Sequence, residues 1–396
     1  MNRPKEIRST GLIVAGVHLG GPGYPNAERT LMALRESGEV TIREYGHWLP
    51  DDFRLWQLAR APLLKRAALI ARIVLGNLWS GLRSLIGFWQ TGQPVYVPYP
   101  AVPLLWLLSW LPRKMRPVLI ADAFISLWDS LFIDRGGSGS AKNGFRWLWR
   151  LEGRALRSAD HVLTDTTANA VYFVSCFGLD PARVRAIPLA VIEPEAIPMR
   201  QPAIMLRQKR FRVIYIGTLV PLHGIDCLLR GIEPLLKDGR LEFWIVGDGQ
   251  ESPVVEAFCA AHPGISLQWI RDWQSPAEVS ALIQSAHVCL GVFGGGGKAA
   301  RVLPFKLYMY LAHGRAVITQ AAMSLPAGVP SPPVIGIDWK QPEQISSKLL
   351  HLLSNPSQRE KLEREAEAYF NSYLSNARVV EAWLELLRDI AELQRN

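Results

Sequence analysis

The chain has 396 residues, 49% of them hydrophobic and 20% charged, which is enough for two domains of ordinary size and too apolar for a chain that is disordered as a whole. Its formal net charge of +9 favours polyanionic partners such as anionic lipid or phosphorylated small molecules. We expect no nucleic-acid partner, because the basic residues are not interleaved with aromatics in any known reader motif. The four cysteines are scattered without a zinc spacing, so no metal site is expected.

Apolar runs of strand length alternate with helical patterns along the chain, in two sets. The strand-like runs lie at 11–17, 40–46, 94–99, 117–122 and 161–165, and then at 212–217, 241–249, 265–270, 287–293 and 315–320. Apolar strands separated by helices are typical of parallel sheets covered on both faces. We therefore expect an α/β fold with two Rossmann-like, doubly wound domains. Their expected ranges are 1–198 and 205–375, with the boundary in the proline-rich stretch 191–211 and a final helix at 376–396.

Residues 53–90 are strongly apolar and carry several arginines and tryptophans but no acidic residue. A basic, tryptophan-bearing amphipathic segment is typical of a helix that lies in a membrane interface, so we expect this segment to contact an anionic membrane surface. The alternative is a pair of core-packing helices with an incidental basic edge. No segment offers about 20 uninterrupted apolar residues, so we expect no membrane span. Residues 95–112, the nearest candidate, favour a strand, a turn and a short buried helix.

In open parallel sheets, ligands bind at the carboxyl ends of the strands. After the run at 212–217, Gly217 and Gly224 flank a loop whose backbone amides could approach a phosphate, although the same glycines suit an ordinary turn. At the end of 265–270, Trp269 could form the wall of a nucleobase pocket or serve as a structural side chain.

A run of glycines follows the strand expected at 287–293. It ends with Gly295, Gly296 and Gly297, and three cations follow at Lys298, Arg301 and Lys306. The spacing does not fit a P-loop, which requires a further glycine and a hydroxyl-bearing residue. Lys306 stands near the positive end of a predicted helix, where a cation is unfavourable unless an anion is present. This arrangement favours a bound diphosphate. The alternative is a flexible glycine loop with solvated cations.

The stretches "RVIYIGTLVPLHGIDCLLRGIEPLL", "LEFWIVGDGQ" and "LPFKLYMYLAHGRAVITQ" resemble, in order and spacing, the nucleotide-sugar domain of glycosyltransferase family 4. This is a GT-B family that includes enzymes of bacterial polysaccharide assembly. "GPGYPNAERTLMALRESGEV" in the first half is similar to the opening loop and helix of the acceptor domain. The resemblance implies two Rossmann-like domains facing across a cleft, with the final helix packing back on the first. It implies a nucleotide-diphosphate sugar as donor substrate and no cofactor or metal.

The family pattern carries over unevenly. Members often have an arginine and a lysine in the first loop, where this chain has Thr218 and His223. The "PFK" variant is kept at Lys306, so Lys298, Arg301 and Lys306 are expected to supply the cations for the diphosphate. A family glutamate that contacts the ribose falls on Met309, which leaves open a catalytically impaired sugar-nucleotide-binding protein.

On the acceptor side, Gly20 and Gly21 could face the donor phosphate. His18 ends a strand and points either there or into the core. Asp122 ends another strand and could act as general base in an inverting transfer, or serve as a turn residue.

The resemblance thus implies a glycosyltransferase that moves a hexose-type sugar to a hydroxyl of a lipid-linked or other saccharide acceptor. Since the family mostly retains anomeric configuration, a retaining reaction is expected. The basic segment places the protein in the cytoplasm, peripheral on the inner face of the plasma membrane.

Overall fold

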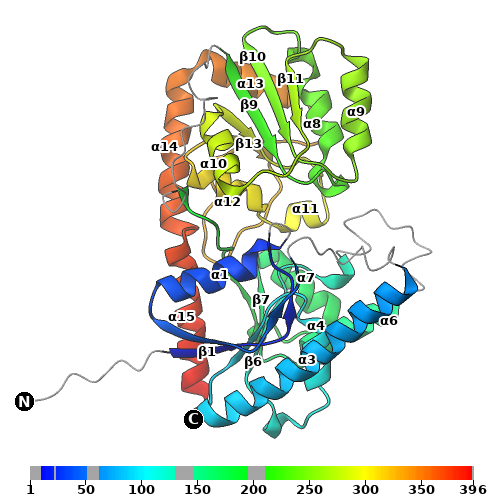
Figure 1. Cartoon of the computed structure of the whole chain (residues 1–396). Helices are drawn as coiled ribbons and strands as arrows, with labels where there is room; N and C mark the ends of the chain where they lie inside the picture. The colour runs from blue at the N-terminus through cyan, green and yellow to red at the C-terminus, as the bar shows by residue number, and fades with distance from the viewer. Residues whose placement is uncertain (1–9, 22–23, 51–61, 130–145, 195–209, 395–396) are drawn as a thin grey trace, which may run out of the picture. The chain divides into compact units, whose positions relative to one another are not determined.

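Two parallel sheets organise the chain, each in its own unit (Figure 1). The computed structural model describes the chain except residues 1–9, 22–23, 51–61, 130–145, 195–209 and 395–396. The first unit holds the described residues up to Asp129, those of 146–190, and the C-terminal helix. The second holds the described residues of 191–375.

The sheet of the first unit has the strand order β3-β1-β5-β6-β7-β8, with every neighbouring pair parallel. Its strands are β1 (Thr10–Val14), β3 (Val40–Glu44), β5 (Val95–Val97), β6 (Leu119–Asp122), β7 (His161–Thr164) and β8 (Val184–Ala186). A short parallel pair, β2 (Val17–His18) with β4 (His47–Trp48), extends beyond β1 and β3. The expected parallel α/β sheet is present.

Helices cover both faces of this sheet. The helix α1 (Pro25–Glu36) packs against α15 (Asn376–Leu393), so the last helix of the chain belongs to the first unit. The opposite face carries α3 (Leu63–Thr91), α4 (Val102–Leu108), α6 (Arg146–Ser158) and α7 (Thr167–Phe177), each in contact with the next (Figure 1). The strand, turn and short helix expected at 95–112 are confirmed as β5 and α4.

The sheet of the second unit has the order β11-β10-β9-β12-β13-β14, again parallel throughout. Its strands are β9 (Phe211–Ile216), β10 (Leu241–Val246), β11 (Leu267–Ile270), β12 (Val288–Leu290), β13 (Ala316–Gln320) and β14 (Ile335–Ile337). Strand order reverses between β9 and β12. In doubly wound sheets such a reversal separates two loops and leaves a place for a ligand at the carboxyl ends of the strands.

The helices of the second unit also lie on both faces of their sheet (Figure 1). One face carries α8 (Ile225–Ile232), α9 (Ser252–Ala261) and α13 (Glu343–Ser354); the other carries α10 (Pro276–Ser285), α12 (Phe305–Ala312) and α14 (Pro356–Tyr373). A short helix, α11 (Lys298–Arg301), follows the glycine run and contacts the 3₁₀ turn Pro221–His223. Two loops that are far apart in sequence therefore meet at the reversal between β9 and β12.

The helix α3 is unusual because its polarity is inverted. Its buried positions are small or polar, namely Asn77, Ser80, Gly81, Ser84 and Gly87. Its exposed positions include Leu64, Leu75, Leu78, Trp79, Leu82 and Trp89. By length and composition alone α3 could cross a membrane, with 22% of its most apolar window buried in the protein. The expectation of no membrane span, which was based on the lack of about 20 uninterrupted apolar residues, stays a prediction, because isolated cations interrupt the apolar run of α3 without ending the helix.

Candidate functional site

The loops after β9 and β12 pack backbone against backbone at the strand-order reversal. The Phe293 N–H donates to the His223 carbonyl over 3.0 Å. A Cβ on Gly224, whose φ is +66°, would lie 2.3 Å from the Phe293 carbonyl, and a Cβ on Gly294 would lie 1.9 Å from the Leu222 carbonyl. These two glycines are therefore needed for the close approach of the loops. They place the first loop, at 217–224, directly beside the glycine run.

Lys306, the second residue of α12, lies beneath the first loop. Its side chain is buried, with the residue 5% exposed, and its Nζ has no hydrogen-bond partner among the described residues. Nζ lies 3.7 Å from the centroid of the Tyr215 ring, a cation–π contact. A Cβ on Gly217 would lie 2.8 Å from Nζ, so only glycine at 217 leaves room for the amine. Burial holds the pKa of Lys306 well below its usual value.

His223 faces into the first loop. Its Nδ1 lies 2.6 Å from the Thr218 carbonyl and 3.1 Å from the Tyr215 hydroxyl. Burial first, and the nearby Lys306 second, lower the pKa of His223 to about 3, so the imidazole is neutral at physiological pH. Its ring helps to shape the loop, while Thr218 itself is exposed. The first loop thus brings no fixed cation of its own to the site.

The glycine run divides into a fixed part and an open part. Gly295, with φ at +85°, is buried, and a Cβ there would lie 2.8 Å from the Trp339 ring. Gly296 and Gly297 are exposed, and a Cβ on either would meet nothing within 4 Å. Gly297 has φ 63° and ψ −128°, a conformation that glycine alone adopts readily. The half-buried cations Lys298 and Arg301 follow on α11.

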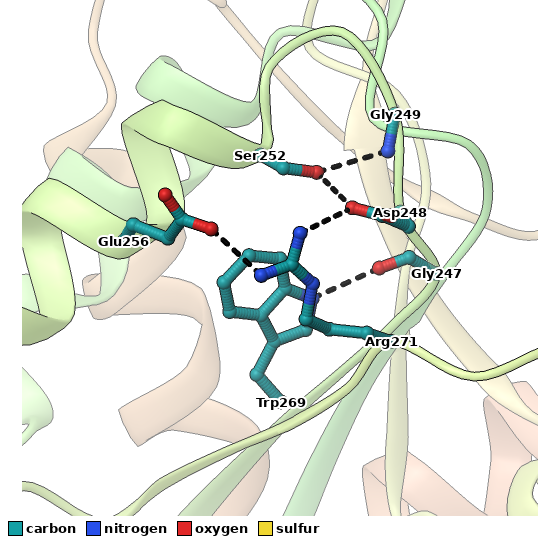
Figure 2. Close-up of polar contacts among 7 residues, drawn as sticks. All are labelled: Gly247, Asp248, Gly249, Ser252, Glu256, Trp269 and Arg271. Carbon is teal, nitrogen blue, oxygen red and sulfur yellow. Dashed lines mark hydrogen bonds and ion pairs between the residues drawn. The ribbon is translucent and has the colours of Figure 1, made fainter.

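Trp269 is half-buried, and the side chain of Arg271 lies beside its ring (Figure 2). Its indole N–H donates to the Gly247 carbonyl over 2.9 Å, and its ring packs against the core of the second unit. The Arg271 guanidinium lies 4.6 Å from the Trp269 ring centroid, held by Asp248 at 3.2 Å and Glu256 at 2.7 Å. Arg271 therefore covers one face of the indole that was predicted to meet a nucleobase. Trp273, the next tryptophan along the chain, is exposed.

In the first unit, His18 ends β2 with its side chain fully buried. Its ring meets Trp48 edge to face at 4.9 Å, and a Cβ on Gly46 would lie 1.9 Å from its Nε2. Neither ring nitrogen has a hydrogen-bond partner within the described part of the chain. Burial lowers the pKa of His18 to about 3, which keeps it neutral. Of the two orientations weighed for His18, the structure shows the one in the core.

The glycines that follow His18 are also held in the fold. A Cβ on Gly20 would lie 2.8 Å from the Trp48 ring. The Gly21 N–H donates to Glu28 Oε2 over 3.2 Å, at the start of α1. Glu28 thus accepts a hydrogen bond from the Gly21 amide, which was predicted to face a donor phosphate.

Asp122, the last residue of β6, is buried with both oxygens engaged. The Tyr96 hydroxyl donates to Oδ2 over 3.0 Å, and the Phe124 N–H donates to Oδ1 over 3.2 Å. Desolvation raises the pKa of Asp122 to about 6 in spite of these hydrogen bonds, which lower it. Tyr96 in turn packs edge to face on Trp383 of α15, with centroids 4.9 Å apart. These contacts are those of a turn residue, which was the alternative to the role of general base for Asp122.

Sequence reasoning missed Tyr215, which carries the Lys306 amine on its ring. Within the uniformly apolar run of β9, a tyrosine gives no signal that separates it from core residues. In the described residues, no group of three or more His, Cys, Asp or Glu side chains gathers in a way that could hold a metal ion.

Comparison with known proteins adds two findings. Residues 210–355, from the start of β9 to the end of α13, match the family model described as Glycosyl transferases group 1. No curated protein matches the chain.

Among solved structures, HepE of Anabaena in complex with UDP superposes with a TM-score of 0.64 at 12% identity, over 96% of this chain and 100% of that one. HepE in complex with UDP-glucose superposes with a TM-score of 0.63 at 12% identity, over 96% of this chain and 99% of that one. The UDP-forming α,α-trehalose-phosphate synthase of Burkholderia vietnamiensis superposes with a TM-score of 0.66 at 14% identity, over 96% of this chain and 100% of that one.

The two parallel-sheet units and these neighbours define the fold as GT-B, as the sequence predicted. The family match falls on the unit that holds Lys306 and the glycine run. Fold and match together indicate a glycosyltransferase.

Proposed function

We propose that the protein transfers a hexose-type sugar from a nucleotide-diphosphate sugar, and that the diphosphate binds at the strand-order reversal of the second unit. The observation that carries this proposal is the buried Lys306 amine without a polar partner among the described residues. A buried amine costs free energy unless an anion is present, so a ligand that supplies negative charge would stabilise Lys306 in this position. That HepE was solved with UDP and with UDP-glucose supports a nucleotide sugar as this ligand.

The chemistry requires stabilisation of the departing diphosphate. The amine of Lys306, the side chains of Lys298 and Arg301 and the open peptides of Gly296 and Gly297 are the groups that would take this charge. Preorganised donors of this kind are the main source of catalysis when charge develops on a leaving group. We place the protein in glycosyltransferase family 4, with a retaining and metal-independent reaction.

We further propose that α3 rests on an anionic membrane and that the acceptor is a lipid-linked saccharide in polysaccharide assembly. Ten large apolar side chains of α3 are exposed, from Leu63 to Trp89. The cations Lys65, Arg72 and Arg83 are exposed along the same helix, and α3 has no acidic residue to offset them. Exposed apolar surface ringed by cations fits the interface of an anionic lipid bilayer.

The polar side of α3 supports this orientation. Ser80 Oγ accepts from the Gly16 N–H over 2.7 Å, and Asn77 Oδ1 accepts from the Val17 N–H over 3.2 Å. These bonds fix the small, polar face of the helix on the first unit and leave its apolar face outward. We propose that the helix, held in this way, lies along a membrane surface. We also propose that the protein is cytoplasmic and peripheral on the inner face of the plasma membrane.

The test of the donor proposal is release of nucleoside diphosphate from UDP, GDP and ADP sugars by the purified protein. We expect one base to support release and Lys306→Ala to abolish it. The matched control is Lys348→Ala, which removes an exposed lysine from α13 of the same unit. Equal release by Lys306→Ala and the wild type would remove the basis of the proposal.

Met309 supports a second candidate, a sugar-nucleotide-binding protein with impaired transfer. Its side chain is half-buried one turn after Lys306 and offers no carboxylate to a ribose. Tight binding of a nucleotide sugar without any release of the diphosphate would favour this candidate.

A further inference from the structure

The side chain of Gln320 holds the glycine run from below. Gln320 is the last residue of β13 and is fully buried. Its Oε1 accepts from the Gly295 N–H over 2.8 Å, and its Nε2 donates to the Gly295 carbonyl over 3.0 Å and to the Ala322 carbonyl over 2.7 Å. Both amide hydrogens and the amide oxygen are thus in use.

This contact continues the pairing of β12 and β13 beyond the end of the strands. The Gly291 N–H donates to the Ile318 carbonyl over 2.8 Å, and the Gln320 N–H donates to the Val292 carbonyl over 2.9 Å. The Thr319 hydroxyl then accepts from the Val292 N–H and donates to its carbonyl, each over 3.1 Å. Side chains of β13 therefore replace backbone groups in the ladder as far as Gly295.

The other sides of the same segment are closed as well. Trp339 lies against Gly295, and the first loop lies against Phe293 and Gly294. The backbone from Phe293 to Gly295 is therefore held by contacts on several sides. The exposed peptides of Gly296 and Gly297 follow directly after the residue that Gln320 contacts. Since these open peptides lead into Lys298, their position depends on the anchor at Gly295.

We propose that Gln320 is a positioning residue for the donor: it anchors Gly295 so that Gly296, Gly297 and Lys298 are held where the distal phosphate binds. This inference rests on the proposed function of the same site. Glutamine suits the position because it presents an acceptor and two donors on one planar group. Glutamate has the same shape but would set an acceptor against the carbonyls of Gly295 and Ala322.

The test compares a diphosphate with a monophosphate, using UDP with UMP, and the corresponding guanine and adenine pairs, in calorimetric titrations. In Gln320→Glu we expect diphosphate affinity to fall about tenfold or more while monophosphate affinity changes less than about threefold, as for loss of one hydrogen bond at a charged ligand. Gln320→Met, which is neutral and of similar length, should show the same selective loss. Gln268→Glu makes the same exchange at an exposed position of β11 and should change neither affinity.

If Gln320 had a purely structural role, its substitution would weaken binding of the diphosphate and of the monophosphate equally, because the whole unit would be disturbed. That result, or diphosphate binding at wild-type strength in both variants, would overturn the inference. If the wild type binds none of the three nucleoside diphosphates, the proposed function fails first and takes this inference with it. If the wild type binds a nucleoside diphosphate and the Gln320 variants bind it equally well, the proposed function stands and the inference alone fails.

Discussion

Lys306 in the second unit and Asp122 in the first are both buried ionisable groups at the carboxyl edge of a parallel sheet, but their surroundings differ. Asp122 accepts hydrogen bonds from the Tyr96 hydroxyl and the Phe124 N–H. The Lys306 amine has the face of Tyr215 and no hydrogen-bond partner among the described residues. A buried charge that is satisfied within the fold serves the fold, whereas one left without a partner serves a ligand. We therefore propose that Lys306 contacts the donor and that Asp122 supports the fold.

The largest effect is expected from Lys306→Met, which keeps the length of the side chain and removes its charge. Removing one member of a buried, hydrogen-bonded charge pair costs about 2–5 kcal/mol, so diphosphate affinity should fall about 30-fold or more. The free protein should become more stable by about 1–2 kcal/mol, because a destabilised site residue is replaced by a well-packed one. Thermal unfolding with and without ligand measures both changes. Loss of stability together with loss of binding would instead indicate a structural lysine.

The pH dependence of binding should follow the same amine. Burial lowers the pKa of Lys306 in the free protein, and a bound diphosphate would raise it again. Between these two values the complex holds more protons than the free protein, so affinity falls as pH rises. Titration calorimetry at pH 8 in buffers of different ionisation enthalpy should show uptake of up to one proton on diphosphate binding. In Lys306→Met the uptake should vanish, and its persistence would assign the proton to another group.

The stability of the free protein should respond to pH in the opposite sense. Because the folded-state pKa of Lys306 lies below its ordinary value of 10.5, the unfolded chain binds more protons over that interval. The contribution of Lys306 to the free energy of unfolding therefore grows as pH rises towards 10.5. Subtracting the Lys306→Met profile from that of the wild type isolates this contribution.

A smaller effect is expected from Asp122→Asn. The amide oxygen still accepts from the Phe124 N–H, and the Tyr96 hydroxyl can turn to accept from the amide NH₂ of the asparagine. Burial raises the pKa of Asp122 to about 6, so its contribution to stability is present at low pH and is lost as pH rises through 6. The variant should therefore be at least as stable as the wild type at pH 8, and donor turnover should fall less than about tenfold. Loss of a general base would cost about 10²–10⁴-fold, and a loss of that size would favour the inverting mechanism.

Each cation of α3 is expected to contribute a small amount to the free energy of membrane binding. Replacing Lys65, Arg72 and Arg83 with glutamine should weaken flotation with anionic vesicles by about 1 kcal/mol for each cation. The matched control replaces three exposed lysines of the second unit, Lys237, Lys348 and Lys361. Binding that ignores both the α3 variant and added salt would argue against an electrostatic membrane contact.

Much of the fold could be predicted because local signals agreed with tertiary structure. The helix α10 begins where its sequence signals a helix start, since Ser275 and Glu278 form a capping box and Pro276 occupies the first turn. The apolar run at 212–217 became the central strand β9. The bounds of α3 were harder to predict, since its buried face is polar and its exposed face apolar, which reverses the usual relation between hydropathy and burial.

The site could be predicted only in part. Glycines and cations in sequence indicated the donor loop, because anion binding needs those residue types together. The supports of that loop gave no signal, because Tyr215 and Gln320 lie at strand positions where a buried tyrosine or glutamine often serves only the packing of the core. For Trp269, the sequence could not show that Arg271 would cover its ring, because that contact depends on Asp248 and Glu256 from another strand end and helix.

We propose that the second unit binds a nucleoside diphosphate through the Lys306 amine, which has no hydrogen-bond partner among the described residues. Calorimetric titration of UDP, GDP and ADP into the wild type and Lys306→Met tests it most directly. We expect saturable binding of one of the three by the wild type and binding at least about 30-fold weaker by the variant. Equal affinities in the two proteins, or no binding of any of the three to the wild type, would contradict it.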